Sequence, residues 1–199
     1  MQDPQYDRLR LTITPVRIAL ESLQVPYAVG GSVAGIAHGY LRFTSDIDIV
    51  ADLKLEHVDF FVRALEDANF YVDAFTIRDA IRYRSGFNVL DENTGVKVDV
   101  FISKQTPWDK QVLERREAGY FGSDPERVFD VETAEDLILS KLRWFKMAGG
   151  VSDKQWGDIL AVLKVQSLAI DLNYLELWAA QLGLTNLLAK ALDEAGFNE

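Results

Sequence analysis

Two short segments place a charged side chain at every second position, and this spacing constrains the fold more than any other feature of the sequence. Residues 46–50 read Asp-Ile-Asp-Ile-Val, and residues 96–102 read Val-Lys-Val-Asp-Val-Phe-Ile. Side chains alternate between the two faces of a β-strand, so each segment predicts a strand with one buried apolar face and one charged face. Asp46 and Asp48 share the charged face of the first strand, and Asp99 lies on that of the second. If the two strands pair, the three carboxylates converge.

Converging carboxylates repel one another unless a proton or a cation lies between them. Their oxygen ligands suit Mg²⁺ or Mn²⁺, which complete their coordination with water and substrate phosphates. The three aspartates therefore predict a two-metal site for phosphoryl or nucleotidyl transfer. Taken alone, an Asp-x-Asp pair is also typical of a solvated strand end. A phosphatase with an aspartyl nucleophile is a further alternative, but that chemistry commonly shows Asp-x-Asp-x-Thr, and position 50 is Val50.

A glycine pair precedes the first of these strands. Residues 27–29 read Tyr-Ala-Val, which is typical of a short buried strand. Gly30, Gly31 and Ser32 follow, ahead of a predicted helix over residues 32–38. Glycines let backbone N–H groups approach a phosphate, and Ser32 with the start of the helix supplies further donors. The alternative interpretation of the three residues is a simple tight turn.

The predicted elements describe an α+β fold: a small mixed β-sheet flanked by helices, followed by a C-terminal helical bundle segment. Up to residue 130 the patterns predict a helix ending near 24, strands at 27–29, 46–50 and 70–72, helices at 32–38 and 55–68, and a β-hairpin of 85–90 and 96–102. Beyond it they predict helices at 133–147, 152–165 and 171–182, and a last one ending at 195. We therefore expect an α/β domain over residues 1–130 and a helical region over 131–199 packed on it.

The composition narrows the class of protein. The chain has 199 residues, no cysteine, and 31 acidic against 21 basic side chains, which gives a net charge of −10. Without cysteine, a disulfide scaffold, thiol catalysis and cysteine-ligated metals are excluded. The acidic surplus argues against a broad electrostatic surface for nucleic acid, and no uncharged apolar run approaches the ~20 residues that span a bilayer. We expect a soluble, cytoplasmic protein that does not contact a membrane.

The order and spacing of the motifs resemble those of the polymerase-β-like nucleotidyltransferase superfamily. The likeness is closest to the small prokaryotic AbiEii-type toxin and minimal nucleotidyltransferase proteins. It rests on Gly30-Gly31-Ser32-Val33-Ala34, His38-Gly39, Arg42-x-Thr44-x-Asp46-Ile47-Asp48-Ile49-Val50 and Val98-Asp99-Val100-Phe101, and it extends through residues 135–142 and 155–160. It therefore covers most of the chain.

The resemblance implies a role for each matched residue. It implies that the triphosphate of an NTP is held by Gly30, Gly31 and Ser32. It also implies that two metal ions, Mg²⁺ or Mn²⁺, are held by the catalytic residues Asp46, Asp48 and Asp99. In this scheme Asp99 also helps to activate the attacking hydroxyl.

Two cations complete the predicted nucleotide site. Lys141 lies on the apolar stripe of the predicted helix 133–147, where an unpaired ammonium is costly, so it needs an anion. That anion is either a triphosphate or Asp158 on the next helix, and in related enzymes a lysine of this helical region contacts the nucleotide. Arg42, just before the aspartate strand, contacts a phosphate or caps the loop.

Other polar and aromatic residues are expected to have structural roles. Trp144 is expected in the core of the helical half, and His38 at a helix end or in the packing. A local basic cluster is expected on solvated surface, with contact to an acceptor RNA or a partner protein as the alternative. This cluster consists of Arg78, Arg82 and Arg84, with Tyr83 among them.

These features predict a metal-dependent enzyme that moves an NMP from an NTP to a hydroxyl acceptor. The acceptor stays open: an RNA end such as the tRNA 3′ end, a protein, or a small molecule such as an aminoglycoside. The alternative is a non-catalytic nucleotide-binding or interaction module, such as one component of a toxin–antitoxin-like pair with a cognate partner protein.

Overall fold

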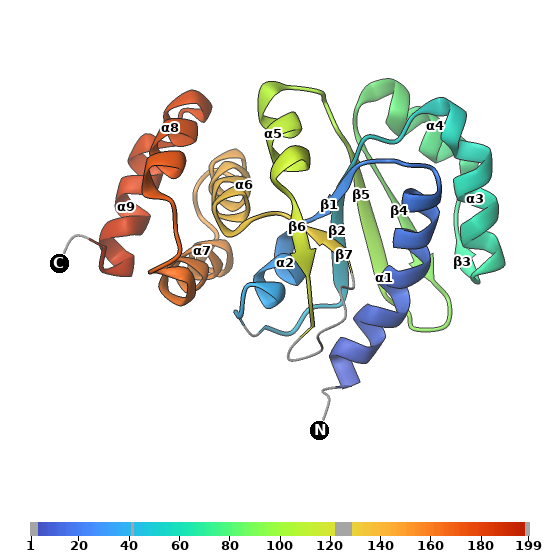
Figure 1. Cartoon of the computed structure of the whole chain (residues 1–199), viewed down its shortest axis with the longest axis horizontal. Helices are drawn as coiled ribbons and strands as arrows, with labels where there is room; N and C mark the ends of the chain where they lie inside the picture. The colour runs from blue at the N-terminus through green and yellow to red at the C-terminus, as the bar shows by residue number, and fades with distance from the viewer. Residues whose placement is uncertain (1–3, 41, 122–128, 198–199) are drawn as a thin grey trace.

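The computed structural model describes residues 4–40, 42–121 and 129–197, and within them a seven-stranded mixed sheet forms the centre of the molecule (Figure 1). The strand order is β3-β4-β5-β2-β1-β7-β6. The strands are β1 (Tyr27–Val29), β2 (Asp46–Ala51), β3 (Phe70–Tyr71), β4 (Gly86–Asp91), β5 (Lys97–Ile102), β6 (Glu117–Gly119) and β7 (Phe129–Val131). The predicted α+β fold with a mixed sheet is confirmed.

The two charged strands are neighbours, as their alternating pattern predicted. β2 and β5 run parallel, and Asp48 lies level with Asp99 in their register. Ile47, Ile49 and Val98 point to the opposite face and are buried. β1 is antiparallel to β2 and parallel to β7. The C-terminal end of β1, which leads into the glycine pair, therefore lies beside the aspartate strand β2.

Helices cover both faces of the sheet. They are α1 (Pro4–Ser22), α2 (Gly31–Ala37), α3 (Val58–Asp67), α4 (Ala74–Tyr83), α5 (Pro107–Arg115), α6 (Ala134–Met147), α7 (Asp153–Gln166), α8 (Leu172–Leu182) and α9 (Thr185–Ala195). α1, α3 and α4 gather on one side of the sheet, and α6 to α9 form a group on the other (Figure 1). The buried core includes apolar residues of α1, α3 and α4 together with the inward face of β2, so the charged face of β2 is directed toward α2 and α6.

The start of α6 is determined by its cap. The Thr133 side chain accepts a hydrogen bond from the Asp136 backbone N–H, which satisfies one of the unpaired donors of the first turn. β7 ends at Val131, two residues before this cap, so the sheet leads directly into the helical segment. The division into domains at residue 130 stays a prediction.

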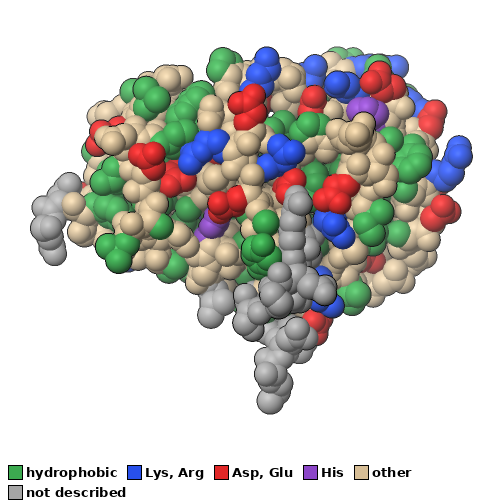
Figure 2. All heavy atoms as spheres, in the orientation of Figure 1, with side chains coloured by type: hydrophobic (Ala, Val, Ile, Leu, Met, Phe, Trp, Pro, Cys, Tyr) green, Lys and Arg blue, Asp and Glu red, His purple; other side chains and the backbone are tan. Residues whose placement is uncertain are grey.

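The surface charge and the character of the helices agree with the composition. Acidic and basic side chains are interspersed over the face shown in Figure 2, without a continuous basic surface. In the described part of the chain, no helix combines the length and the apolar character needed to cross a bilayer.

Candidate active site

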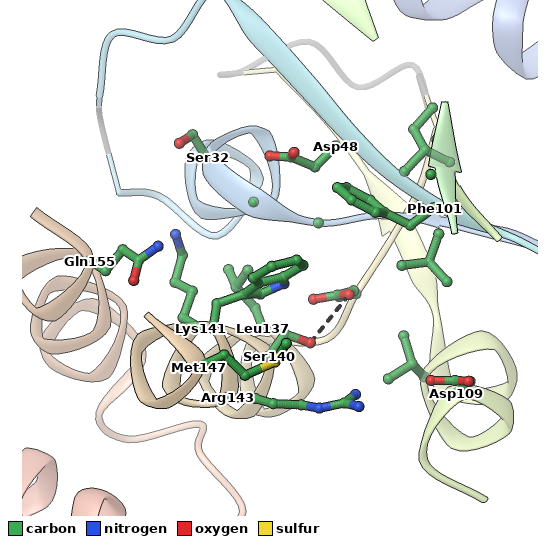
Figure 3. A pocket seen from close by; sticks show the side chains of 18 of the residues that line it. Ser32, Asp48, Phe101, Asp109, Leu137, Ser140, Lys141, Arg143, Met147 and Gln155 are labelled. Carbon is green, nitrogen blue, oxygen red and sulfur yellow. Dashed lines mark hydrogen bonds between the residues drawn. The ribbon is translucent and has the colours of Figure 1, made fainter. Parts of the chain in front are cut away.

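A cavity of about 690 Å³ lies over the charged face of the sheet. Its wall is formed by the glycine pair after β1, by parts of β2, β4 and β5, and by side chains of α5, α6 and α7. Figure 3 shows that Asp48 and Ser32 lie on one side of this space and that Lys141, Ser140 and Arg143 of α6 lie on the other. The cavity therefore lies between the sheet and the helical segment.

The glycine pair is packed directly against the Asp48 carboxylate. Gly31 has φ +59°, and a Cβ built at this position would lie 1.9 Å from Asp48 Oδ2. The Gly30 backbone N–H donates a 2.9 Å hydrogen bond to the Asp48 carbonyl oxygen. Both the left-handed conformation and the close approach require glycine at position 31. The expected proximity of the glycine turn and the aspartate strand is thus present.

Asp48 lies in an environment that disfavours its charge. Burial, first, and the negative charge of Asp99, second, raise the pKa of the Asp48 carboxyl, and the ammonium of Lys141 partly opposes them. A cation bound beside the two carboxylates would relieve this cost.

Lys97 lies where such a cation is expected. Its Nζ is 2.7 Å from Asp99 Oδ2, and this hydrogen bond is the main cause of the raised pKa of Lys97. Asp46 lies level with Lys97 in the register and is exposed. Among the described residues, no group of three or more acidic or histidine side chains is arranged to hold a metal ion.

The carboxylates nevertheless fit a divalent ion in part. Asp48 and Asp99 supply oxygen ligands at the same level of adjacent strands. Mg²⁺ is commonly held by one or two carboxylates together with substrate phosphates and water. Two of the three predicted ligands are therefore side by side, and the assignment of all three as metal ligands stays a prediction.

Asp158 pairs with both of the predicted phosphate-binding cations. It is 4% exposed, and its Oδ2 contacts Arg42 Nη1 and lies 3.0 Å from Lys141 Nζ. The Tyr40 hydroxyl donates a 3.4 Å hydrogen bond to Oδ1. Two cations surround one carboxylate, so this group carries an excess positive charge, and Arg42, Lys141 and Asp158 all line the cavity. Of the two partners expected for Lys141, the structure shows Asp158.

The side chain of Lys141 is directed toward the glycine turn. In Figure 3 it extends from α6 in the direction of Ser32, with Gln155 of α7 beside it. The ion pair with Asp158 fixes the position of this ammonium. The single negative charge of Asp158 does not neutralise both the ammonium and the Arg42 guanidinium. The end of the cavity beside the glycine pair therefore combines backbone N–H groups with two cations, of whose two positive charges Asp158 compensates one.

Glu132 is a site residue that the sequence did not reveal. It is 3% exposed, its Oε1 accepts a 3.4 Å hydrogen bond from Ser140, and its Oε2 has no partner among the described residues. A Cβ at Gly30 would lie 3.2 Å from its Oε1, so Asp48 and Glu132 flank the glycine pair. Burial, first, and the charge of Asp136 raise the pKa of Glu132 to about 8.

Two expectations about individual residues have opposite outcomes. Trp144 is 51% exposed, so its expected place in the core is wrong. It lines the cavity, and its ring lies 5.8 Å from that of Phe101. His38 follows the last residue of α2, is buried, and its Nε2 is 2.7 Å from the Glu132 carbonyl oxygen, which confirms the expected helix-end role.

Within the described part of the chain, Arg84 is the one residue of the predicted basic cluster that lines the cavity. Arg78 pairs with Asp59 and Arg82 pairs with Asp79 outside it. The predicted solvated surface therefore holds for the last two.

No protein-family model matches the sequence, and no curated protein sequence matches it. Solved structures do match. A solution structure of the antibiotic-resistance factor ANT(2″)-Ia aligns with 96% of this chain and 98% of its own, at 15% identity and a TM-score of 0.56. An antigenic nucleotidyltransferase-like protein from Paracoccidioides brasiliensis aligns over 95% of this chain and 92% of its own, at 20% identity and a TM-score of 0.58.

A crystal structure of ANT(2″)-Ia in complex with adenylyl-2″-tobramycin covers 87% of this chain and 96% of its own, at 14% identity and a TM-score of 0.53. The similarity to all three extends over both the sheet and the helical segment. The closer likeness to AbiEii-type proteins stays a prediction. The chain has the nucleotidyltransferase fold that its resemblance to the polymerase-β-like superfamily implies.

Proposed function

We propose that the chain is a metal-dependent nucleotidyltransferase that moves an NMP from an NTP to a hydroxyl acceptor. The observation that carries this proposal is the Asp48 carboxylate packed against Gly31 on the wall of the cavity. A phosphate held by the glycine turn would lie directly beside this carboxylate. The nucleotidyltransferase fold supports the same assignment.

The donor is assigned to the end of the cavity beside the glycine pair. Backbone N–H groups of Gly31 and Ser32 would donate hydrogen bonds to the triphosphate. Arg42 and Lys141 would bind its phosphates and neutralise part of their charge, because Asp158 compensates only one of the two positive charges. Asp158 would therefore act as a positioning residue for both cations.

The transfer itself needs the acceptor oxygen aligned with the α-phosphorus. A new bond forms between these two atoms, the bond from the α-phosphorus to its bridging oxygen breaks, and pyrophosphate leaves. Mg²⁺ or Mn²⁺ held by Asp46, Asp48 and Asp99 would lower the pKa of the acceptor hydroxyl and stabilise the leaving pyrophosphate. Asp99 would orient the hydroxyl and accept its proton as the new bond forms.

A thermal unfolding experiment tests donor binding. An NTP with Mg²⁺ at about 100 times its Kd is expected to stabilise the fold by about 2.7 kcal/mol, since only the native state binds it. The double variant D46A/D48A should lose this stabilisation. No change in melting temperature with any of the four NTPs in the presence of Mg²⁺ or Mn²⁺ would contradict the proposal.

Replacement of Lys97 tests whether its ammonium competes with the metal. The Lys97 ammonium pairs with Asp99, so a metal ion must displace it. K97A should therefore lower the Mn²⁺ concentration that half-saturates the site, by about threefold to tenfold, as measured by Mn²⁺ electron paramagnetic resonance titration. K164A, which removes an exposed cation of α7 away from the aspartates, is the control. An unchanged half-saturation in K97A would contradict the placement of the metal.

The Lys97–Asp99 pair also favours a second candidate, a non-catalytic nucleotide-binding or interaction module. In such a module Lys97 would neutralise the Asp99 carboxylate permanently. One component of a toxin–antitoxin-like pair is an example of such a module. Co-purification of a cognate protein, together with nucleotide binding that does not depend on Mg²⁺, would favour this candidate.

A further inference from the structure

A second set of cations lies at the other end of the cavity. Arg84 precedes β4, Lys104 follows β5, and Arg143 extends from α6, and all three line the cavity. The sheet order is β1-β2-β5-β4, and neighbouring strands lie about 4.8 Å apart, so β4 lies roughly 14 Å from β1. The two aspartate strands therefore separate Arg84 from the glycine pair, and Lys104 lies beyond the C-terminal end of β5.

The orientation of the α6 side chains agrees with this separation. Figure 3 shows Lys141 directed toward Ser32 and Arg143 directed away from it, toward the side of the cavity where Asp109 lies. The two cations of this helix therefore serve different ends of the same space.

These cations are not neutralised by carboxylates. Arg84 Nη1 donates a 2.7 Å hydrogen bond to the Ser103 carbonyl oxygen, and neither Lys104 nor Arg143 has an ion-pair partner in the described ranges. Asp109 is the acidic residue lining this end. It accepts a hydrogen bond from the Thr106 N–H at the start of α5, so it is part of that helix cap. Three positive charges thus face one negative charge, in a chain whose net charge is −10.

The donor does not account for this positive charge. All the charge of an NTP lies on its triphosphate, which is assigned to the opposite end of the cavity, and its nucleoside part is neutral. The guanidinium groups of Arg84 and Arg143 match a phosphate or carboxylate in shape and in hydrogen-bonding pattern. A polycationic acceptor would be repelled at this end.

We infer that the acceptor carries a phosphate or carboxylate group, which Arg84, Lys104 and Arg143 bind while its hydroxyl reaches the neighbouring carboxylates of Asp48 and Asp99. This inference rests on the proposed nucleotidyl transfer. The exposed ring of Trp144 beside Phe101 provides an apolar surface next to these cations. An anionic acceptor is a substrate class opposite in charge to an aminoglycoside.

The test follows an α-phosphate-labelled NTP into fractionated cell extract. The extract is separated into small anionic, neutral and cationic molecules, RNA and protein, and each pool is incubated with the wild-type chain, labelled NTP and Mg²⁺. We expect label in the small anionic pool or on the RNA, both of which carry the inferred group. Treatment of the anionic pool with phosphatase beforehand distinguishes a phosphate, which it removes, from a carboxylate, which it leaves.

Single-residue variants then test whether the labelled acceptor is bound by these cations. R143A and R84A should each raise the amount of acceptor pool needed for half-maximal rate by about tenfold, since each removes a charge-assisted hydrogen bond. The KM for the NTP should stay within about twofold of wild type. R82A is the matched control, because this arginine lies two residues from Arg84 and pairs with Asp79 outside the cavity.

The outcomes separate the two proposals. Label in the neutral, cationic or protein pool would overturn the inference and leave nucleotidyl transfer standing. Label in the anionic pool or RNA with unchanged acceptor dependence in both R143A and R84A would also overturn it. No label in any pool would contradict the proposed function itself and the inference that rests on it.

Discussion

D48N is expected to lower the rate of nucleotidyl transfer on the order of 10³-fold, about 4 kcal/mol of transition-state stabilisation, without lowering the stability of the fold. The carboxylate is packed against Gly31 and lies level with Asp99, so its loss removes a ligand at the reacting phosphate. The amide keeps the shape of the side chain and therefore its contacts.

The stability of D48N should equal or exceed that of wild type at pH 7. Burial and the Asp99 charge raise the pKa of Asp48, which means that its ionised form is disfavoured in the native state. Neutralising it removes that cost. Initial rates and thermal unfolding, measured on the same preparations, test both parts. D67N on α3 is the control, and it should match wild type in both. A D48N enzyme with near-normal rate, or one that unfolds more easily, would contradict the assigned role.

E132Q should change how stability depends on pH. The native pKa of Glu132 is about 8, against 4.5 for the ordinary side chain. The native state therefore holds the proton more tightly than the unfolded chain, and wild-type stability falls as pH rises from about 4.5 to about 8. At ~1.4 kcal/mol per pKa unit, the wild type should lose roughly 5 kcal/mol relative to E132Q across this range. Below pH 4.5 the difference between the two should be constant.

Urea unfolding at several pH values measures this difference. E114Q, at an exposed position of α5, should follow the wild-type profile throughout. If the free-energy difference between E132Q and wild type does not grow between pH 5 and 8, Glu132 does not carry a proton at neutral pH. The Glu132 carboxyl lies beside Gly30, so its neutral form would also avoid repelling a triphosphate bound at the glycine pair.

The sequence predicted the elements whose pattern is local. The alternation in β2 and β5 and the three- and four-residue spacing in α3 and α6 gave the correct types of element with boundaries close to those observed. The pairing of β2 with β5 was expected from the shared charged face. The exact register, with Asp48 opposite Asp99 and Asp46 opposite Lys97, depends on the sheet as a whole and was not predictable.

Other elements were missed because their signals are short or mixed. α4 and α5 begin at the caps Asp73 and Thr106 and are only ten and nine residues long, and neither helix was predicted from the sequence. β6 and β7 are only three residues long, and β7 pairs with β1 across a long sequence separation. Without β7, nothing in the sequence placed Glu132 beside the glycine pair.

At the site, too, local sequence patterns predicted some side-chain positions and missed those that depend on how distant elements pack. Lys141 was correctly expected to need an anion because its helix stripe is apolar, and Asp158 was one of its two candidates. Trp144 lies on the same stripe, but α6 passes over the open cavity at this point and leaves the ring half exposed. Helical spacing identifies the side that faces the sheet, whereas the presence of a cavity depends on how the helices pack.

The central claim is that the α-phosphate, and not the γ-phosphate, is transferred. The direct measurement uses two preparations of the same NTP, labelled at one or the other phosphate, with the wild-type chain, Mg²⁺ and cell extract. We predict that the α-label appears on an acceptor, that the γ-label appears in pyrophosphate, and that both products disappear with D48N. Transfer of the γ-label to an acceptor would contradict the account. So would its release as inorganic phosphate beyond the level seen with D48N, while the α-label stays in a nucleoside diphosphate.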